Sequence, residues 1–249
     1  MENQIAIEVK NVSKIFPTNY KMARLQLKSI VYEAIFGYKN KDILKENQIY
    51  ALKNINFSVQ KNEKIAILGT NGSGKSTLLK MLNGIYMPDA GEININGTLG
   101  GILELSSGFK PELTGLDNIY LKLGIQGKVT SELEQTVKEI IEFSEMENQI
   151  NMPFKNYSSG MKSKLGFAIS SAMKPDILIL DEVFAAGDKK FREKSGKRIR
   201  EMCDNMTTIL VSHNMQIIKN IANRVIVLKN GQIVFDGATE EGITYYQRQ

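Results

Sequence analysis

The chain has 249 residues, of which 42% are hydrophobic and 24% charged, with a net charge of +5 and one cysteine. This length can bury a substantial core, but no apolar run approaches the roughly 20 residues of a membrane span. The polar start at Met1–Gln4 argues against a signal peptide, and the single Cys203 argues against a disulfide framework. The composition therefore predicts a cytoplasmic protein that cannot form a pore, and the modest, dispersed positive charge favours a membrane-surface neighbour over nucleic acid.

Three strand-like segments in the first hundred residues predict an antiparallel sheet: Ile5–Val9, Ile55–Val59 and Glu92–Asn96. Between the first two lies a long insertion, residues 17–49, that has the pattern of an amphipathic helix with six basic and three acidic residues. This pattern fits a surface helix packed on its own domain as well as it fits a contact with a partner. Its apolar stripe consists of Leu27, Ile30, Val31, Ala34 and Ile35.

Residues 69–77 match the phosphate-binding pattern G-x-x-x-x-G-K-[ST] at every position. They lie between an apolar strand-like run, Lys64–Leu68, and a helix-spaced run, Leu78–Leu82. Glycines let backbone amides approach phosphates at a positive helix end, Lys75 would bridge the terminal phosphates, and the Ser76 hydroxyl would bind Mg²⁺. The sequence thus predicts a nucleotide site formed by Gly69, Thr70, Asn71, Gly72, Ser73, Gly74, Lys75, Ser76 and Thr77.

A helical region follows. Residues 132–143 place Leu133, Val137, Ile140 and Ile141 on one face of a predicted helix. Further on, Tyr157–Met161 precedes a helix predicted over Met161–Ala172. The Ser158 hydroxyl and the Gly160 amide would then lie at a positive helix end suited to a γ-phosphate, although a simple N-cap turn has the same pattern.

The last third of the chain returns to strands. Asp176–Glu182 is an apolar run that ends in two carboxylates: Asp181 can hold Mg²⁺, and Glu182 can orient or deprotonate the water that attacks a γ-phosphate. Taken alone, an ordinary core strand with a solvated end is an equal interpretation. The sole histidine, His213, follows the strand-like Thr207–Ser212 and could hydrogen-bond the same phosphate. A closing hairpin over 224–236, with its turn at Asn230-Gly231, and a terminal helix complete the pattern.

In this order, the phosphate loop, Tyr157–Met161, the carboxylate pair and the histidine resemble the ATP-binding-cassette (ABC) proteins, whose LSGGQ signature corresponds to YSSGM here. The resemblance implies an α/β fold: a P-loop ATPase with a RecA-like core sheet, an antiparallel β subdomain and a helical signature subdomain. It assigns residues 1–249 to one nucleotide-binding domain, with the helical part at about 103–163 and a tail at 238–249. It also implies ATP and Mg²⁺ as cofactors and Glu182, His213 and Lys75 as catalytic residues.

The family's remaining sites are also assigned by resemblance. Ser158 and Gly160 would bind the γ-phosphate held by the other subunit of a homodimer, and Asp188, in the D-loop-like Ala185–Asp188, would connect the two sites unless it is only a helix N-cap. Where the family has a Q-loop glutamine this chain has Leu105, so either the adjacent Glu104 supplies the metal and water contact or the loop acts without a side-chain ligand.

An aromatic side chain is expected to stack on adenine. Phe16 in the Asn11–Phe16 segment is the first choice, with Tyr20 and Tyr50 as alternatives. Core packing explains an aromatic residue equally well at each of the three positions.

The insertion, together with Tyr50–Ile55, Gly108–Gly115 and the YSSGM motif, resembles the ATPase subunits of bacterial exporters of O-antigen, capsule or teichoic acid. That resemblance implies a peripheral protein on the cytoplasmic face of the cell membrane, paired with integral membrane permease subunits, with no nucleic acid expected and no sugar-binding domain evident. Alternatives are an importer ATPase, or a soluble ABC ATPase acting on ribosomes or DNA. The single cassette without a long coiled coil disfavours the soluble class.

Overall fold

The computed structural model describes residues 4–18, 48–102, 108–125, 133–181 and 188–248. Most of the predicted insertion, together with Tyr20, Glu104, Leu105 and Glu182, lies outside these ranges. Among the described residues, no helix is both long and apolar enough to cross a membrane.

The smaller of two sheets is antiparallel, as predicted. Its strands lie in the order β2-β1-β4, and alternating apolar residues of β1 face the core, because side chains on successive strand residues point to opposite faces. The register places Val9 between Phe57 and Ile93. The strands are β1 (Ile5–Pro17), β2 (Gln48–Gln60) and β4 (Ala90–Ile95).

The larger sheet has six strands in the order β5-β6-β7-β3-β8-β9, all parallel except the last. Its central strands are apolar on both faces, as expected for a parallel sheet that is covered on both sides. The register aligns Ile67, Val211 and Asp181, so three neighbouring strands end at the same edge. The strands are β3 (Lys64–Leu68), β5 (Leu99–Ile102), β6 (Ile177–Asp181), β7 (Thr207–Val211), β8 (Arg224–Lys229) and β9 (Gln232–Ala238).

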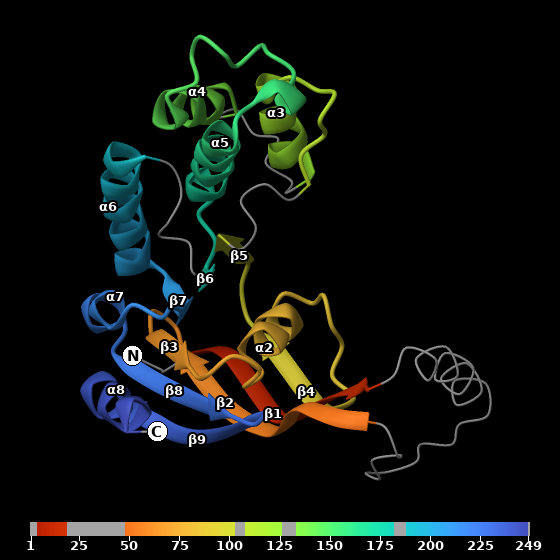
Figure 1. Ribbon diagram of the computed structural model, residues 1–249, viewed down its shortest axis with the longest axis vertical. Helices are drawn as coiled ribbons and strands as arrows, with labels where there is room; N and C mark the ends of the chain where they lie inside the picture. The colour runs from red at the N-terminus through yellow and green to blue at the C-terminus, as the bar shows by residue number, and fades with distance from the viewer. Residues whose placement is uncertain (1–3, 19–47, 103–107, 126–132, 182–187, 249) are drawn as a thin grey trace, which may run out of the picture.

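Helices cover both faces of this sheet (Figure 1). Ile65 and Ile67 pack on one face with α2 and the small sheet, whereas Ala66 and Leu68 face the core formed with α6, α7 and α8. This strict alternation along β3 buries both faces of the strand, and the phosphate loop follows its last residue, Leu68. The helices are α2 (Lys75–Leu82), α6 (Lys189–Asn205), α7 (Met215–Ile221) and α8 (Thr239–Gln247), the last being the predicted terminal helix.

A helical lobe, formed by α3 (Gly115–Ile125), α4 (Leu133–Ser144) and α5 (Ser159–Ala172), stands at one end of the sheets (Figure 1). It has its own core, in which Val137 and Ile140 are buried as the sequence pattern predicts. The start predicted for α5 at Met161 is wrong. The helix begins two residues earlier, at Ser159, because the Ser158 hydroxyl accepts a hydrogen bond from the Met161 amide and caps the helix there.

The predicted closing hairpin is confirmed. β8 and β9 pair antiparallel, and their two-residue turn has left-handed backbone at Asn230 (φ 49°) and Gly231 (φ 74°), as a type I′ turn requires. Asn and Gly tolerate this conformation better than other residues.

Candidate nucleotide site

The phosphate loop runs from the end of β3 to the start of α2, and backbone crowding shapes it. Gly72 and Gly74 have φ values of 80° and 108°. A Cβ atom on Gly69 would lie 2.5 Å from the Leu228 carbonyl oxygen, and one on Gly74 would lie 2.6 Å from that of Ala51. Positions 69 and 74 therefore admit only glycine, and at Gly72 the left-handed backbone favours it although space is open there.

A small pocket of about 200 Å³ opens on this loop. Sequence reasoning missed one of its residues, Ala51, because Ala51 belongs to β2 and no local pattern connects it to the loop. The lining residues are Ala51, Asn71, Gly72, Gly74, Lys75, Ser76 and Thr77.

The Lys75 ammonium lies inside the curve of the loop. Its Nζ donates to the carbonyl oxygens of Gly69 (2.7 Å) and Thr70 (3.0 Å). Phosphate oxygens are stronger acceptors than these carbonyls, because they are charged. A loop with glycine at its crowded positions, a helix start without a side-chain cap and a central ammonium together fit the phosphates of a nucleotide.

The strand ends bring Asp181 and His213 to the edge that carries this loop. Asp181 ends β6 and is half-buried, and its Cα pairs with Val211, the last residue of β7. Val211 in turn pairs with Ile67, two residues before Gly69. The exposed His213 follows β7 in a turn fixed by Ser212, whose buried hydroxyl accepts from the Asn214 amide at 3.1 Å. Glu182, one residue past Asp181, lies outside the described residues.

Ser158 and Gly160 lie elsewhere. Both are at the start of α5 in the helical lobe, whereas the loop adjoins α2 on the large sheet (Figure 1). The Ser158 hydroxyl accepts from the Met161 amide at 3.2 Å, and its side chain is exposed. Within one chain, Ser158 is therefore an N-cap and does not join the phosphate loop in one site.

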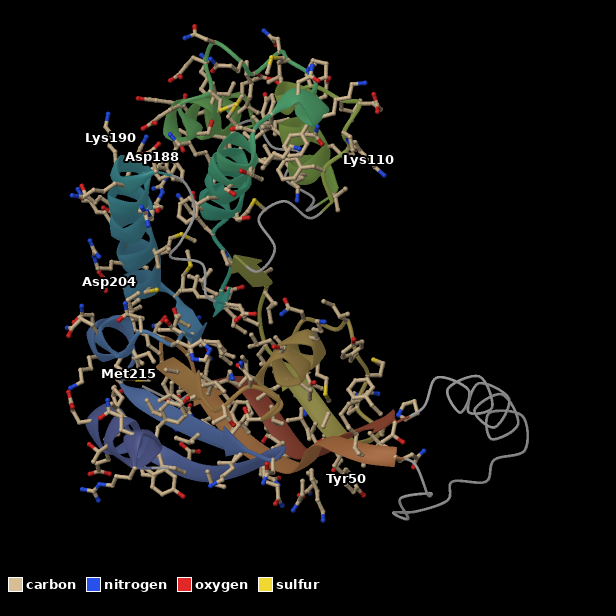
Figure 2. All side chains as sticks on the ribbon, in the orientation of Figure 1. Tyr50, Lys110, Asp188, Lys190, Asp204 and Met215 are labelled. Atoms are coloured by element: carbon tan, nitrogen blue, oxygen red, sulfur yellow. The ribbon has the colours of Figure 1, made fainter. Side chains whose placement is uncertain are left out.

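Asp188 lies at the end of α6 nearest the helical lobe (Figure 2). Its Oδ1 accepts from the Phe191 amide at 2.9 Å, so the N-cap alternative is realised within the chain. Its Oδ2 lies 2.8 Å from Nζ of Lys164 on α5, which also pairs with Glu145 at 3.0 Å. Lys164 and the Phe191 amide lower the pKa of Asp188 to about 2, so it is ionised at neutral pH. Its role between subunits stays a prediction.

The candidate adenine-stacking residues lie on the small sheet. Phe16 is half-buried, with its ring in an edge contact to Tyr86 at 5.5 Å between centroids. Tyr50, on β2 (Figure 2), has the Lys53 ammonium 5.4 Å from its ring centre. Neither aromatic lines the pocket on the phosphate loop. Stacking by Phe16 stays a prediction, with Tyr86 packing as the observed contact.

The segment Phe109–Gly115 is joined to the loop that leads to Ser158, a connection that sequence reasoning did not reveal. The Phe109 and Phe154 rings stack 4.3 Å apart, and the Tyr157 hydroxyl donates to the Gln149 carbonyl at 2.8 Å. A Cβ on Gly115 would collide with the Tyr157 hydroxyl. The first residue of YSSGM is therefore a buried anchor, and the motif's polar residues remain outside the core.

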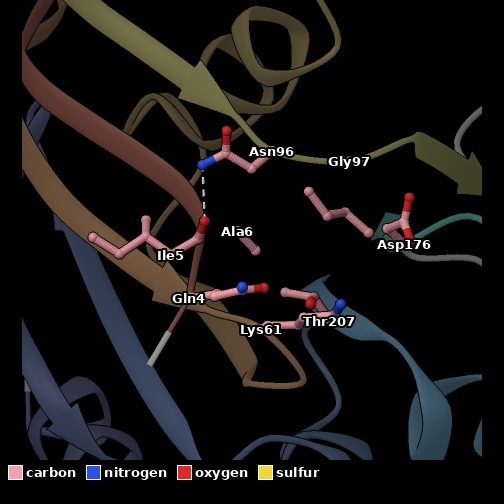
Figure 3. A pocket seen from close by; sticks show the side chains of 9 residues that line it. Gln4, Ile5, Ala6, Lys61, Asn96, Gly97, Asp176 and Thr207 are labelled. Carbon is pink, nitrogen blue, oxygen red and sulfur yellow. Dashed lines mark hydrogen bonds between the residues drawn. The ribbon is translucent and has the colours of Figure 1, made fainter. Parts of the chain in front are cut away.

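A larger hollow of about 470 Å³ lies at the opposite edge of the sheet, near the amino ends of β6 and β7 (Figure 3). Two of its polar side chains form structural hydrogen bonds: Asn96 Nδ2 donates to the Ile5 carbonyl at 2.9 Å, and Asp176 Oδ2 accepts from the Thr98 amide at 2.7 Å. The Thr98 amide and hydroxyl lower the pKa of Asp176. This hollow lies between the two sheets and is separate from the nucleotide site.

Comparison with known proteins agrees with this geometry. Residues 52–185 match the family model of the ABC transporter. The chain is 40% identical over 243 residues to the O-antigen export system ATP-binding protein RfbB of Klebsiella pneumoniae, covering 97% of both chains. It is 36% identical over 242 residues to the teichoic acids export ATP-binding protein TagH of Listeria monocytogenes serotype 4b (strain F2365), covering 97% of this chain and 69% of TagH.

The fold has solved counterparts. A structure described as the ATP-binding subunit of an ABC transporter superposes with a TM-score of 0.73 at 22% identity, over 97% of this chain and 93% of that one. A dimeric ATP-binding cassette, MJ0796, bound to ADP and Pi gives a TM-score of 0.69 at 24% identity, over 94% and 98% of the two chains. At this identity the likeness shows the fold alone, and the predicted fold class is confirmed. The matched family model and the relative that is 40% identical along nearly its whole length show that this chain belongs to the ABC transporter family, as an ATPase subunit.

Proposed function

We propose that this chain is the ATP-hydrolysing subunit that powers export of a lipid-linked polysaccharide through a separate membrane permease. One observation carries the mechanism: the phosphate loop, Asp181 and His213 share one sheet edge, while the signature serine lies at an exposed helix start in the other lobe. Half of a composite site is thus assembled, and its complement faces outward. Two copies arranged head to tail would complete two sites.

The amides of the loop, from Gly72 to Thr77, bind the phosphates of ATP, and Lys75 exchanges its two carbonyl acceptors for phosphate oxygens. The Ser76 hydroxyl and the Asp181 carboxylate would hold Mg²⁺, and Glu104 would be a further oxygen ligand in place of the family's glutamine. When bound, the ion neutralises phosphate charge during transfer. Phe16 stacks on adenine.

Glu182 follows Asp181 at the strand end, where its carboxylate takes the proton of the attacking water. His213, held by the Ser212–Asn214 turn, donates to the γ-phosphate and helps to orient that water. Ser158 and Gly160 of the second copy supply the positive helix end on the other side of the phosphate. Asp188 links the two sites from its position at the start of α6.

The cargo is inferred from the relatives. RfbB is named for O-antigen export and TagH for teichoic acids export, and the chain matches both over 97% of its length. Closure of the ATP-bound dimer moves the permease, and hydrolysis reopens it. In this proposal the chain lies peripherally on the cytoplasmic face of the membrane, as one nucleotide-binding domain whose helical part carries the signature. No role for nucleic acid is proposed.

The test is to tag the Glu182→Gln variant, which should bind ATP without hydrolysing it, and to isolate it from its native membranes. A polytopic export permease in the complex supports the proposal, whereas ribosomal or DNA-bound material overturns the transport assignment. In vitro, Glu182→Gln should become a dimer with saturating Mg-ATP. A variant that stays monomeric contradicts the composite site. The matched control is Glu182→Gln with Lys75→Ala, which should not dimerise.

A further inference from the structure

Three backbone segments meet at the C-terminal half of the phosphate loop, one of them being the loop itself. They are β2 at Ala51, the loop at Ser73-Gly74, and the β8–β9 turn at Gly231. The Gly231 amide donates to the Ser73 carbonyl at 3.0 Å, and the Gly231 carbonyl accepts from the Lys53 amide at 2.8 Å. The turn therefore forms a hydrogen-bonded link between the loop and β2.

No side chain fits between these segments. A Cβ on Gly231 would lie 2.7 Å from the Ala51 carbonyl oxygen and 3.0 Å from its carbon, and Gly74 approaches the same oxygen from the loop. Gly231 also has a φ of 74°, which disfavours other residues. Any residue with a Cβ at position 231 must therefore displace the turn from β2, and the turn carries the Ser73 carbonyl with it.

The same hairpin also touches the beginning of the loop. Val227 of β8 pairs with Leu68, the last residue of β3, and the Leu228 carbonyl limits the space around Gly69. The loop is thus held near its start by Leu228 and near its end by Gly231. Because β8 is buried and hydrogen-bonded along its length, this support is rigid.

We propose that Gly231 is a positioning residue for ATP binding: through Ser73 it sets the direction of the loop amides, although it does not line the pocket itself. This inference rests on the proposed binding of ATP phosphates by the loop. It predicts that displacement of the turn costs more free energy of nucleotide binding than free energy of unfolding, because the loop is the element that the turn holds in place.

The test compares Gly231→Ala with Gly84→Ala. Gly84 has a φ of 69°, and a Cβ there meets nothing within 4 Å, so this control has the backbone strain without the collision. We expect Gly231→Ala to weaken ATP binding about tenfold and to raise KM more than it lowers kcat, while Gly84→Ala shifts ATP affinity less than about twofold. Thermal unfolding without nucleotide measures the structural cost of each variant.

Wild-type affinity in Gly231→Ala overturns the inference and leaves the proposed function intact, whereas a wild-type chain that binds no ATP overturns the proposed function. If Gly231→Ala does not fold, exchange of the Gly231 amide proton is measured by NMR in the wild-type chain with and without ADP. Slower exchange at Gly231 with ADP, and no change at Gly84, supports the link. An unchanged rate at Gly231 overturns it.

Discussion

The starts of α2 and α5 both present helix amides, but they are built in opposite ways. α2 begins at Lys75, after Gly74, which has a left-handed backbone and no side chain that could cap the helix. α5 begins after Ser158, whose hydroxyl accepts a hydrogen bond from the Met161 amide. An uncapped helix start leaves amides for a ligand, and a capped start is satisfied within its own chain. The comparison teaches that the start of α2 is built to offer backbone amides to a ligand, whereas the start of α5 is capped within its own chain.

The largest loss of ATP affinity should come from adding one methyl group at Gly74, just before α2. In Gly74→Ala the new Cβ meets the Ala51 carbonyl, and the left-handed backbone is strained as well. We expect ATP affinity to fall at least about 100-fold and the free energy of unfolding to fall by about 2–3 kcal/mol. Calorimetric titration and urea unfolding measure the two quantities. If Gly74→Ala binds ATP as tightly as the Gly84→Ala control, backbone crowding does not shape the loop.

A smaller loss should follow removal of the lysine charge. Lys75→Ala removes a charged donor worth about 1.5–3 kcal/mol, so ATP should bind about 10- to 100-fold more weakly. The fold should survive, because the bonds from Nζ to Gly69 and Thr70 are local and α2 keeps its buried apolar residues. Lys80→Ala, an exposed lysine on the same helix, is the matched control in the same titration. Equal ATP affinities of the Lys75→Ala and Lys80→Ala variants would contradict a role for Lys75 in ATP binding.

In both regions the sequence predicts local features better than contacts between distant segments. The phosphate loop, the strand before it and the Asp181 strand are coded by adjacent residues, so their local patterns suffice. The hydrogen bond from Gly231 to Ser73, the contact of Gly115 with Tyr157, and the ion pair of Lys164 with Asp188 join distant segments. No periodicity encodes such contacts, because they arise only when the sheet order is set. For the same reason Ala51 was missed as a lining residue.

The capped start should respond differently from the loop. Ser158→Ala removes a cap worth about 1 kcal/mol of stability, but a single subunit should bind ATP with unchanged affinity. Hydrolysis, measured at protein concentrations that favour dimers, should fall strongly if, as proposed, the second copy supplies this serine. Thr114→Ala is the control, since the Thr114 hydroxyl also accepts from a first-turn amide, that of Asp117 at 3.1 Å. If Ser158→Ala hydrolyses ATP as fast as Thr114→Ala, Ser158 serves only its own helix.

The smallest effect concerns the ion pair that ties α5 to α6. The pKa of Asp188 is lowered from about 3.8 to about 2, first by Lys164 and then by the Phe191 amide. A lowered pKa means that ionised Asp188 favours the folded state above about pH 3.8 and that this contribution disappears as the pH falls to about 2. Lys164→Met should therefore raise the pKa of Asp188 toward 3.8 without reaching it, because the hydrogen bond from the Phe191 amide remains.

The difference in urea midpoint between wild type and Lys164→Met should be small at pH 7, because Asp188 is exposed, and it should shrink further below pH 3. NMR titration of the Asp188 carboxyl carbon gives the pKa directly. A pKa of about 2 in Lys164→Met would assign the shift to the helix cap alone. The link between the helical lobe and α6 would then depend on packing and on the pair of Lys194 with Glu145, 3.5 Å apart, rather than on the pair of Lys164 with Asp188.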